Sequence, residues 1–128
     1  MEPFPEDLAR FMYDNVESID QLEILRILGE RREKEWDCAA LAEAVQAKPQ
    51  AVKAHLIAMH ARGLLVMTAS ESGLSCRFGL NTAELEIMVL RLLQMYKERP
   101  VTMIKMVYAR AQDPLRAFAD AFRIRKQD

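Results

Sequence analysis

The sequence predicts a mainly α-helical fold with one small β-hairpin, and three observations carry this prediction. About half of the 128 residues are hydrophobic and 29% are charged, which is the ordinary balance of a globular domain. Apolar residues recur at three- and four-residue spacing through most of the chain. Only two short segments, 64–68 and 76–80, are typical of β-strands, and a polar loop at 69–75 separates them.

Two helices are expected in the first 30 residues. Pro5 suits the first position of a helix because its missing N–H is not needed there, and an apolar stripe follows it at Leu8, Phe11, Met12 and Val16. Ser18 is expected to cap the second helix, and Gln21 completes a capping box three residues later. The charged run at 29–35 ends this helix and predicts a solvated turn.

Two more helices are expected on either side of a short break at 46–48. Asp37 can cap a short helix over 38–45. Pro49 can begin the next helix, which should run to Arg62 and stop at a glycine. Two helices separated by about three residues have the spacing of a helix-turn-helix.

The order of the elements makes this prediction more specific. Helix, short turn, helix, strand, loop and strand follow one another, which is the order of a winged helix-turn-helix. Residues 37–80 should therefore fold as two crossed helices backed by a hairpin that pairs near Leu65 and Phe78. We expect one domain over 1–128, with the winged helix-turn-helix core at about 19–80.

The last third of the chain is expected to form helices that mediate dimerisation, over about 82–123. Asn81 or Thr82 can cap a long helix, Pro100 should interrupt it, and a last short helix should open at Asp113. This region is apolar on more than one side, and a chain of this size has little left to cover it. The expected homodimer interface comprises Leu85, Met88, Val89, Leu92, Tyr96, Ile104 and Tyr108.

The sequence shows no set of residues expected of an enzyme or a metal site, so no catalytic role, metal or cofactor is predicted. Cys38 and Cys76 lie far apart in sequence, and neither His55 nor His60 has a partner at ligand spacing. Cys38 does lie at a helix start, where exposed amides can lower a thiol pKa. No apolar run is long enough to span a membrane and the first residues do not resemble a signal peptide, so a cytoplasmic location is expected.

The segment from 37 to 80 resembles bacterial winged-helix transcriptional regulators of the MarR-like and ArsR-like kind. The resemblance is carried by residues 37–42, 49–56 and 60–65. It implies that the second motif helix binds DNA in the major groove and that the terminal helices make a homodimer. Two features depart from the pattern: Lys48 stands where a capping Ser or Asp is usual, and Glu71 lies at the wing tip with no Arg or Lys.

Two partners are thus expected: double-stranded DNA and a second copy of the chain. The candidate DNA contacts are Lys48, Gln50, Lys53, Ala54, Ile57 and Arg77. Gln50 can bond adenine and Ala54 can contact a thymine methyl group, while the basic side chains suit phosphates. The net charge of −1 means that positive charge must be gathered locally and that non-specific DNA affinity should be weak.

Two alternatives stay open. Ala54, Ile57 and Ala61 make the exposed face of the second motif helix apolar, which also suits a protein–protein interaction module that does not bind DNA. The eight methionines allow a ligand-sensing pocket between the dimer helices, although no polar group marks one.

Overall fold

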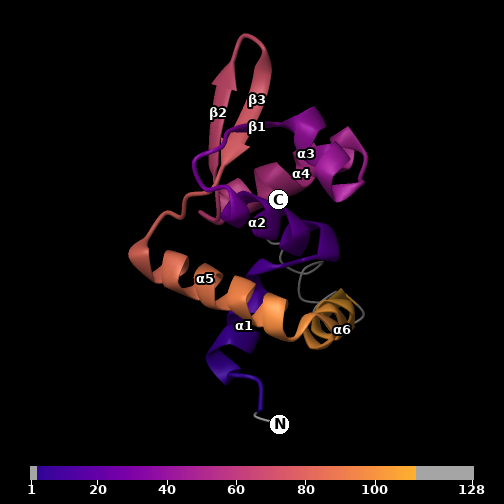
Figure 1. The fold of residues 1–128 in the computed structure, drawn as a ribbon, viewed down its shortest axis with the longest axis vertical. Helices are drawn as coiled ribbons and strands as arrows, with labels where there is room; N and C mark the ends of the chain where they lie inside the picture. The colour runs from indigo at the N-terminus through magenta and orange to yellow at the C-terminus, as the bar shows by residue number, and fades with distance from the viewer. Residues whose placement is uncertain (1–2, 112–128) are drawn as a thin grey trace, which may run out of the picture.

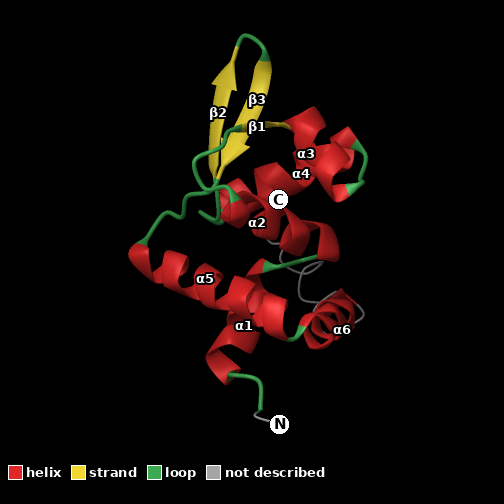
Figure 2. Cartoon of the chain, in the orientation of Figure 1, coloured by secondary structure: helices red, strands yellow, loops and turns green. Residues whose placement is uncertain are grey.

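The computed structural model describes residues 3–111, and this part of the chain forms six helices and one three-stranded sheet (Figures 1 and 2). The helices are α1 (Glu6–Asn15), α2 (Ile19–Glu30), α3 (Cys38–Val45), α4 (Pro49–Ala61), α5 (Ala83–Glu98) and α6 (Pro100–Ala111). The strands are β1 (Trp36–Asp37), β2 (Val66–Ser70) and β3 (Gly73–Arg77). The short helix expected from Asp113 lies outside the described residues.

The elements are stacked along the long axis of the molecule. The β2–β3 hairpin lies at one end and α1 at the other, with α5 running across the middle (Figure 1). Helix α2 is central, since it contacts α3, α4 and α5. Its side chains Leu22, Leu25 and Leu28 are fully buried, so they join the winged-helix part of the core to the part built by the terminal helices.

Side-chain caps fix where three of the helices begin, as the sequence predicted for two of them. The Ser18 hydroxyl accepts a hydrogen bond from the Gln21 amide at 3.3 Å, and Asp37 Oδ1 accepts one from the Ala40 amide at 2.7 Å. Of the two residues considered for the long helix, Thr82 makes the cap. Pro5 lies just before α1 and is not its first residue, which corrects the expected start by one position.

Pro100 separates α5 from α6, as expected. Helix α5 ends at Glu98, Arg99 leaves the helical conformation, and α6 begins at the proline. The missing N–H of proline costs nothing at the first position of a helix, so the sequence restarts the helix in a new direction.

The sheet differs from the prediction in three ways. The strands pair antiparallel in the order β1-β3-β2, with Val66 opposite Arg77 and Ser70 opposite Gly73, so the expected long loop is a tight turn at residues 71–72. The hydrophobic residues that suggested strands at 64–65 and 78 are buried in the core next to the hairpin. The two-residue strand β1, whose Trp36 pairs with Cys76, was not predicted.

Gly63 closes the hairpin at its base. Its φ of +75° is in the left-handed region, and a Cβ here would lie 2.8 Å from Asn81. The Asn81 amide donates to the Gly63 carbonyl at 2.9 Å. The glycine that follows α4 and its cap therefore also holds the end of the wing.

In the described part of the chain, no helix combines the length and apolar character that a membrane span requires.

Candidate nucleic-acid interface

The break between α3 and α4 is a sharp turn and not a continuous helix. Gln46 adopts a left-handed conformation with φ of +58°, and the Ala47 amide donates to the Ala42 carbonyl at 2.9 Å. Lys48 then precedes α4 without a side-chain cap. The chain direction changes within three residues, so α4 packs across α3 as a helix-turn-helix requires.

Helix α4 has one buried and one exposed face. Val52, Leu56 and Met59 are at most 1% exposed and fix the helix on the core. The side chains on the opposite face follow the spacing i, i+4, i+7, i+11, and all of them are exposed: Gln50, Ala54, Ile57 and Ala61. We call these four residues the outer row. Exposed Lys53 and His60 lie along one side of it.

Positive charge is concentrated at the start of α4. Lys48 and Lys53 are both exposed, and among residues 3–111 neither forms an ion pair with an acidic group. The third predicted phosphate contact, Arg77, lies elsewhere. It is opposite Val66 at the base of the hairpin, and its guanidinium donates to the Phe78 carbonyl at 3.2 Å.

The hairpin tip is not basic. Glu71 and Ser72 form the turn, and hydroxyl groups of Thr68, Ser70 and Ser75 follow along the two strands. An acidic tip is repelled by the negative potential of a minor groove. Contacts at the tip therefore add little attraction for DNA, and the start of α4 holds most of the favourable charge.

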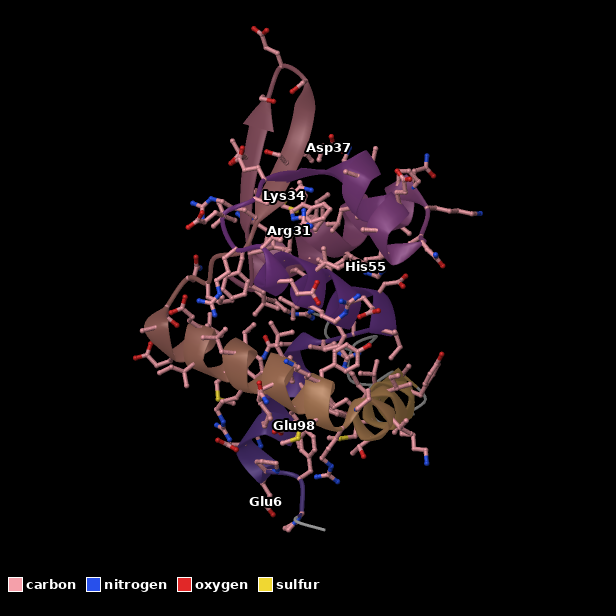
Figure 3. The ribbon with its side chains drawn as sticks, viewed as in Figure 1. Glu6, Arg31, Lys34, Asp37, His55 and Glu98 are labelled. Carbon is pink, nitrogen blue, oxygen red and sulfur yellow. The ribbon has the colours of Figure 1, made fainter. Side chains whose placement is uncertain are left out.

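A buried polar contact that the sequence did not reveal holds α4 against α2. Gln21 is 1% exposed, and its Nε2 lies 3.2 Å from Nδ1 of His55. His55, which is labelled in Figure 3, belongs to α4. The Gln21 Oε1 accepts from the Glu17 amide at 3.0 Å, while His55 Nε2 lies 3.8 Å from Asp20. The sequence predicts only a capping role for Gln21, and nothing in the pattern of α2 marks this glutamine as buried.

A second contact fixes the end of α4. Arg62 pairs with Glu17 and also donates to the Asn15 carbonyl at 3.4 Å. Asn15 is the last residue of α1 and Glu17 lies in the connection to α2, so the end of α4 is tied to this corner, while its middle is tied to α2 through His55. The orientation of the outer row is therefore set by the core.

The residues expected at a dimer interface separate into two groups. Val89 and Leu92 are 0% exposed inside a single chain, so their assignment to an interface is wrong. Helix α5 uses them to pack on α1 and α2. The other five are partly or fully exposed, namely Leu85, Met88, Tyr96, Ile104 and Tyr108. Ile87 and Val101, 59% and 63% exposed, were not predicted as interface residues.

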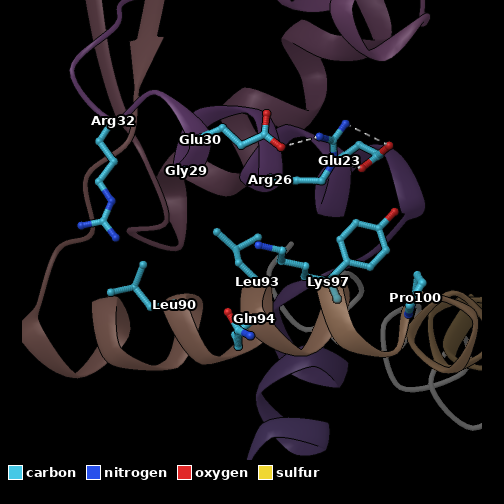
Figure 4. A pocket seen from close by; sticks show the side chains of 11 residues that line it. Glu23, Arg26, Gly29, Glu30, Arg32, Leu90, Leu93, Gln94, Lys97 and Pro100 are labelled. Carbon is cyan, nitrogen blue, oxygen red and sulfur yellow. Dashed lines mark hydrogen bonds and ion pairs between the residues drawn. The ribbon is translucent and has the colours of Figure 1, made fainter.

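An open groove of about 520 Å³ lies between α2 and α5 (Figure 4). Arg26 bridges Glu23 and Glu30 with contacts of 2.7 Å each on one wall, and Leu90, Leu93 and Lys97 rise from the other. Gly29 allows the close approach of the two helices, since a Cβ there would lie 2.7 Å from Leu93. Charged groups and leucines line this groove, so it differs from the methionine-lined pocket that the sequence allowed.

Neither cysteine has the properties of a reactive thiol. Burial raises the pKa of Cys76 to about 11, and the side chain is part of the core. Burial also raises the pKa of Cys38, so the exposed amides at the start of α3 do not activate it.

Several solved structures share this architecture. HlyU of Vibrio cholerae is 19% identical, with a TM-score of 0.54 over 70% of this chain and 90% of its own. The G34K mutant of MepR from S. aureus is 11% identical, with a TM-score of 0.55 over 95% of this chain and 85% of its own. BpsR of Bordetella bronchiseptica, whose DNA binding is regulated by 6-hydroxynicotinic acid, is 12% identical, with a TM-score of 0.52 over 96% and 87%.

No protein-family model and no curated protein sequence matches the chain. At these identities the agreement concerns the path of the backbone and not the contacts of individual side chains. The expected resemblance to MarR-like regulators is confirmed at the level of architecture. The chain has the winged helix-turn-helix fold, with added terminal helices, that it shares with HlyU, MepR and BpsR.

Proposed function

We propose that this protein is a DNA-binding transcriptional regulator that places α4 in the major groove of double-stranded DNA. The observation that carries the proposal is the exposed face of α4 together with Lys48 and Lys53 at its start, which form no ion pair within residues 3–111. The fold shared with BpsR, a protein that binds DNA, supports it. A DNA-binding role in a bacterial cell would place the protein in the cytoplasm.

The dimensions of α4 suit this role. The helix has 13 residues and is therefore about 20 Å long, and a B-DNA major groove about 12 Å wide admits one helix. Residues near the start of the helix reach base edges in such complexes. Gln50, Ala54 and Ile57 are then the base contacts, with both lysines on the phosphates.

The active form in this proposal is a homodimer built by the terminal helices. Four large hydrophobic side chains of the described chain are more than half exposed, and Ile87, Val101 and Tyr108 are three of them, all on α5 and α6. A two-fold dimer would cover them and present two α4 helices to half-sites about 34 Å apart. The two α4 helices, each with only weak positive charge, would then bind one DNA molecule together.

A titration of labelled duplex at low salt, followed by a salt series, tests the proposal. The double variant Lys48→Ala/Lys53→Ala should lower affinity and reduce the slope of log K against log salt by about 2 per protomer. Arg31→Ala/Lys34→Ala is the matched control, because it removes the same charge from exposed positions in the loop between α2 and β1, outside both α4 and the terminal helices. Failure to retain any duplex at low salt, or equal losses in both variants, would contradict it.

The alternative is an interaction module in which the outer row binds another protein. The exposed Ile57, 53% accessible and flanked by alanines, is the observation in its favour. An apolar contact of this kind changes little with salt, whereas DNA binding weakens steeply. Retention on an α4-dependent protein partner at high salt, with no duplex binding, would establish this alternative.

A further inference from the structure

The outer row has an unusual chemistry for a helix that reads DNA. Gln50 has the one hydrogen-bonding side chain in the row, and the other three members are Ala54, Ile57 and Ala61. All four are exposed, so packing in the core does not account for the residue types at these positions. A surface with so few donors and acceptors restricts which base edges can be recognised.

The four base pairs differ in what they present in the major groove. Guanine offers two acceptors that Arg or Lys bonds, and cytosine offers a donor that Asp or Glu accepts. The outer row contains none of these residues, and the nearest cation, Lys53, lies at its side. Thymine alone presents a methyl group, and adenine is the base that Gln bonds with two hydrogen bonds.

The wing does not compensate for this restriction. Its tip residue Glu71 is acidic, and the arginine at the base of the hairpin donates to a backbone carbonyl. Base discrimination therefore falls to α4, whose orientation is fixed by the Gln21–His55 contact and by the Arg62–Glu17 pair.

We infer that α4 recognises A·T base pairs, with Ile57 and Ala54 in contact with thymine methyl groups and Gln50 bonded to adenine. This inference rests on the proposed DNA-binding function and names the class of sequence that the site selects. Ile57 is the main specificity-determining residue, because it has the largest exposed apolar surface on the helix. The lysines beside the row contribute affinity that does not depend on sequence.

The test begins by selecting duplexes from a random library with the purified full chain. The selected sites should be rich in A·T pairs at the positions that α4 covers. Each thymine of a selected duplex is then replaced by deoxyuridine, which removes the methyl group and leaves all hydrogen bonds intact. Affinity should fall about fourfold for each contacted methyl, the fold-change that corresponds to burial of one such group.

Two variants assign the effect to a residue. Ile57→Ala should bind thymine and uracil duplexes equally at the position that Ile57 covers, and its exposed site means that the fold is unaffected. Lys53→Ala should weaken binding to both duplexes by the same factor. Uracil at thymines outside the selected site is the control for the DNA.

The outcomes separate this inference from the proposed function. Selected duplexes bound equally well with thymine and with uracil, or selected sites rich in G·C pairs, would overturn the inference and leave DNA binding intact. If the library yields no enriched or bound duplex at low salt, both fail together.

Discussion

The winged-helix part of the chain and the terminal helices bury their hydrophobic residues to different degrees. From α2 to β3, Ile57 of the outer row is the one large apolar side chain that is strongly exposed. On α5 and α6, three such side chains face outward. The first part is a finished core within one chain, whereas the second offers apolar surface for a further contact.

The two parts also differ in how far their polar contacts are buried. Gln21 and His55 meet in a largely buried site between α2 and α4. Arg91 of α5 meets Asp7 of α1 at 2.7 Å in an exposed pair. A buried contact fixes geometry because its loss leaves an unsatisfied group, while an exposed pair can be replaced by water. The polar contact between α2 and α4 is thus less easily replaced by water than the polar contact between α1 and α5, which are held together by their buried apolar side chains.

The largest effect should come from the shared core. Leu25→Ala removes a fully buried side chain of α2 and should lower the free energy of unfolding by about 2–5 kcal/mol, because it leaves a cavity as well as less buried apolar surface. Urea unfolding followed by circular dichroism measures this. Ile57→Ala is the control and should change stability by less than about 0.5 kcal/mol. If both variants lowered the free energy of unfolding by similar amounts, Leu25 would not be more deeply buried than Ile57.

The buried polar contact gives the next effect. Gln21→Leu should destabilise the protein by about 1–3 kcal/mol although leucine is more hydrophobic, because the Glu17 amide and the His55 ring each lose a partner. A double-mutant cycle with His55→Phe in urea isolates the pairwise energy. Strict additivity of the two changes would mean that the contact does not hold α4 on α2.

The terminal helices should affect assembly more than folding. Ile87→Ser should weaken a homodimer about tenfold or more, which corresponds to about 1.4 kcal/mol, since a two-fold interface loses the side chain twice. Sedimentation equilibrium measures the change. Ala109→Ser, another substitution of an exposed residue in the same region, is the control. An unchanged monomer–dimer equilibrium would remove Ile87 from the interface.

The exposed pair should give the smallest effect. Arg91 lowers the pKa of Asp7 by hydrogen bonding to its carboxylate. Its contribution is therefore present above the unfolded pKa of about 3.8 and is lost as pH falls through the lower folded value. Asp7→Asn should differ slightly from the parent at neutral pH and low salt, and not at all below the folded pKa. If the stabilities of Asp7→Asn and the parent still differ below the folded pKa, the difference comes from a contact other than the ion pair.

The sequence was a good guide wherever a local rule decides the structure. Ser18 and Asp37 cap the predicted helices, and Pro49 and Pro100 begin helices where proline is favourable. The exposed face of α4 also followed from helical spacing, since its buried residues all fall on the opposite side. These features depend on residues within a few positions of one another.

The errors concern partners that are distant in sequence. Val89 and Leu92 have the apolar character of interface residues, but only the tertiary packing shows that α1 and α2 cover them. Strand β1 exists because Trp36 meets Cys76, which is 40 residues away. The Gln21–His55 contact likewise joins residues 34 positions apart. Helical period and propensity contain no information about such pairs.

The junction of Gly63 and Asn81, together with the pairing of β3 with β1, holds the base of the wing and leaves its tip free of the core. The hydrogen bond between their backbones fixes where the chain leaves α4 and where it enters the segment before α5. The hairpin can therefore gain or lose residues at its tip without transmitting a shift to the helices on either side. Insertions at 71–72 should be tolerated, whereas any side chain at position 63 would push the two ends apart.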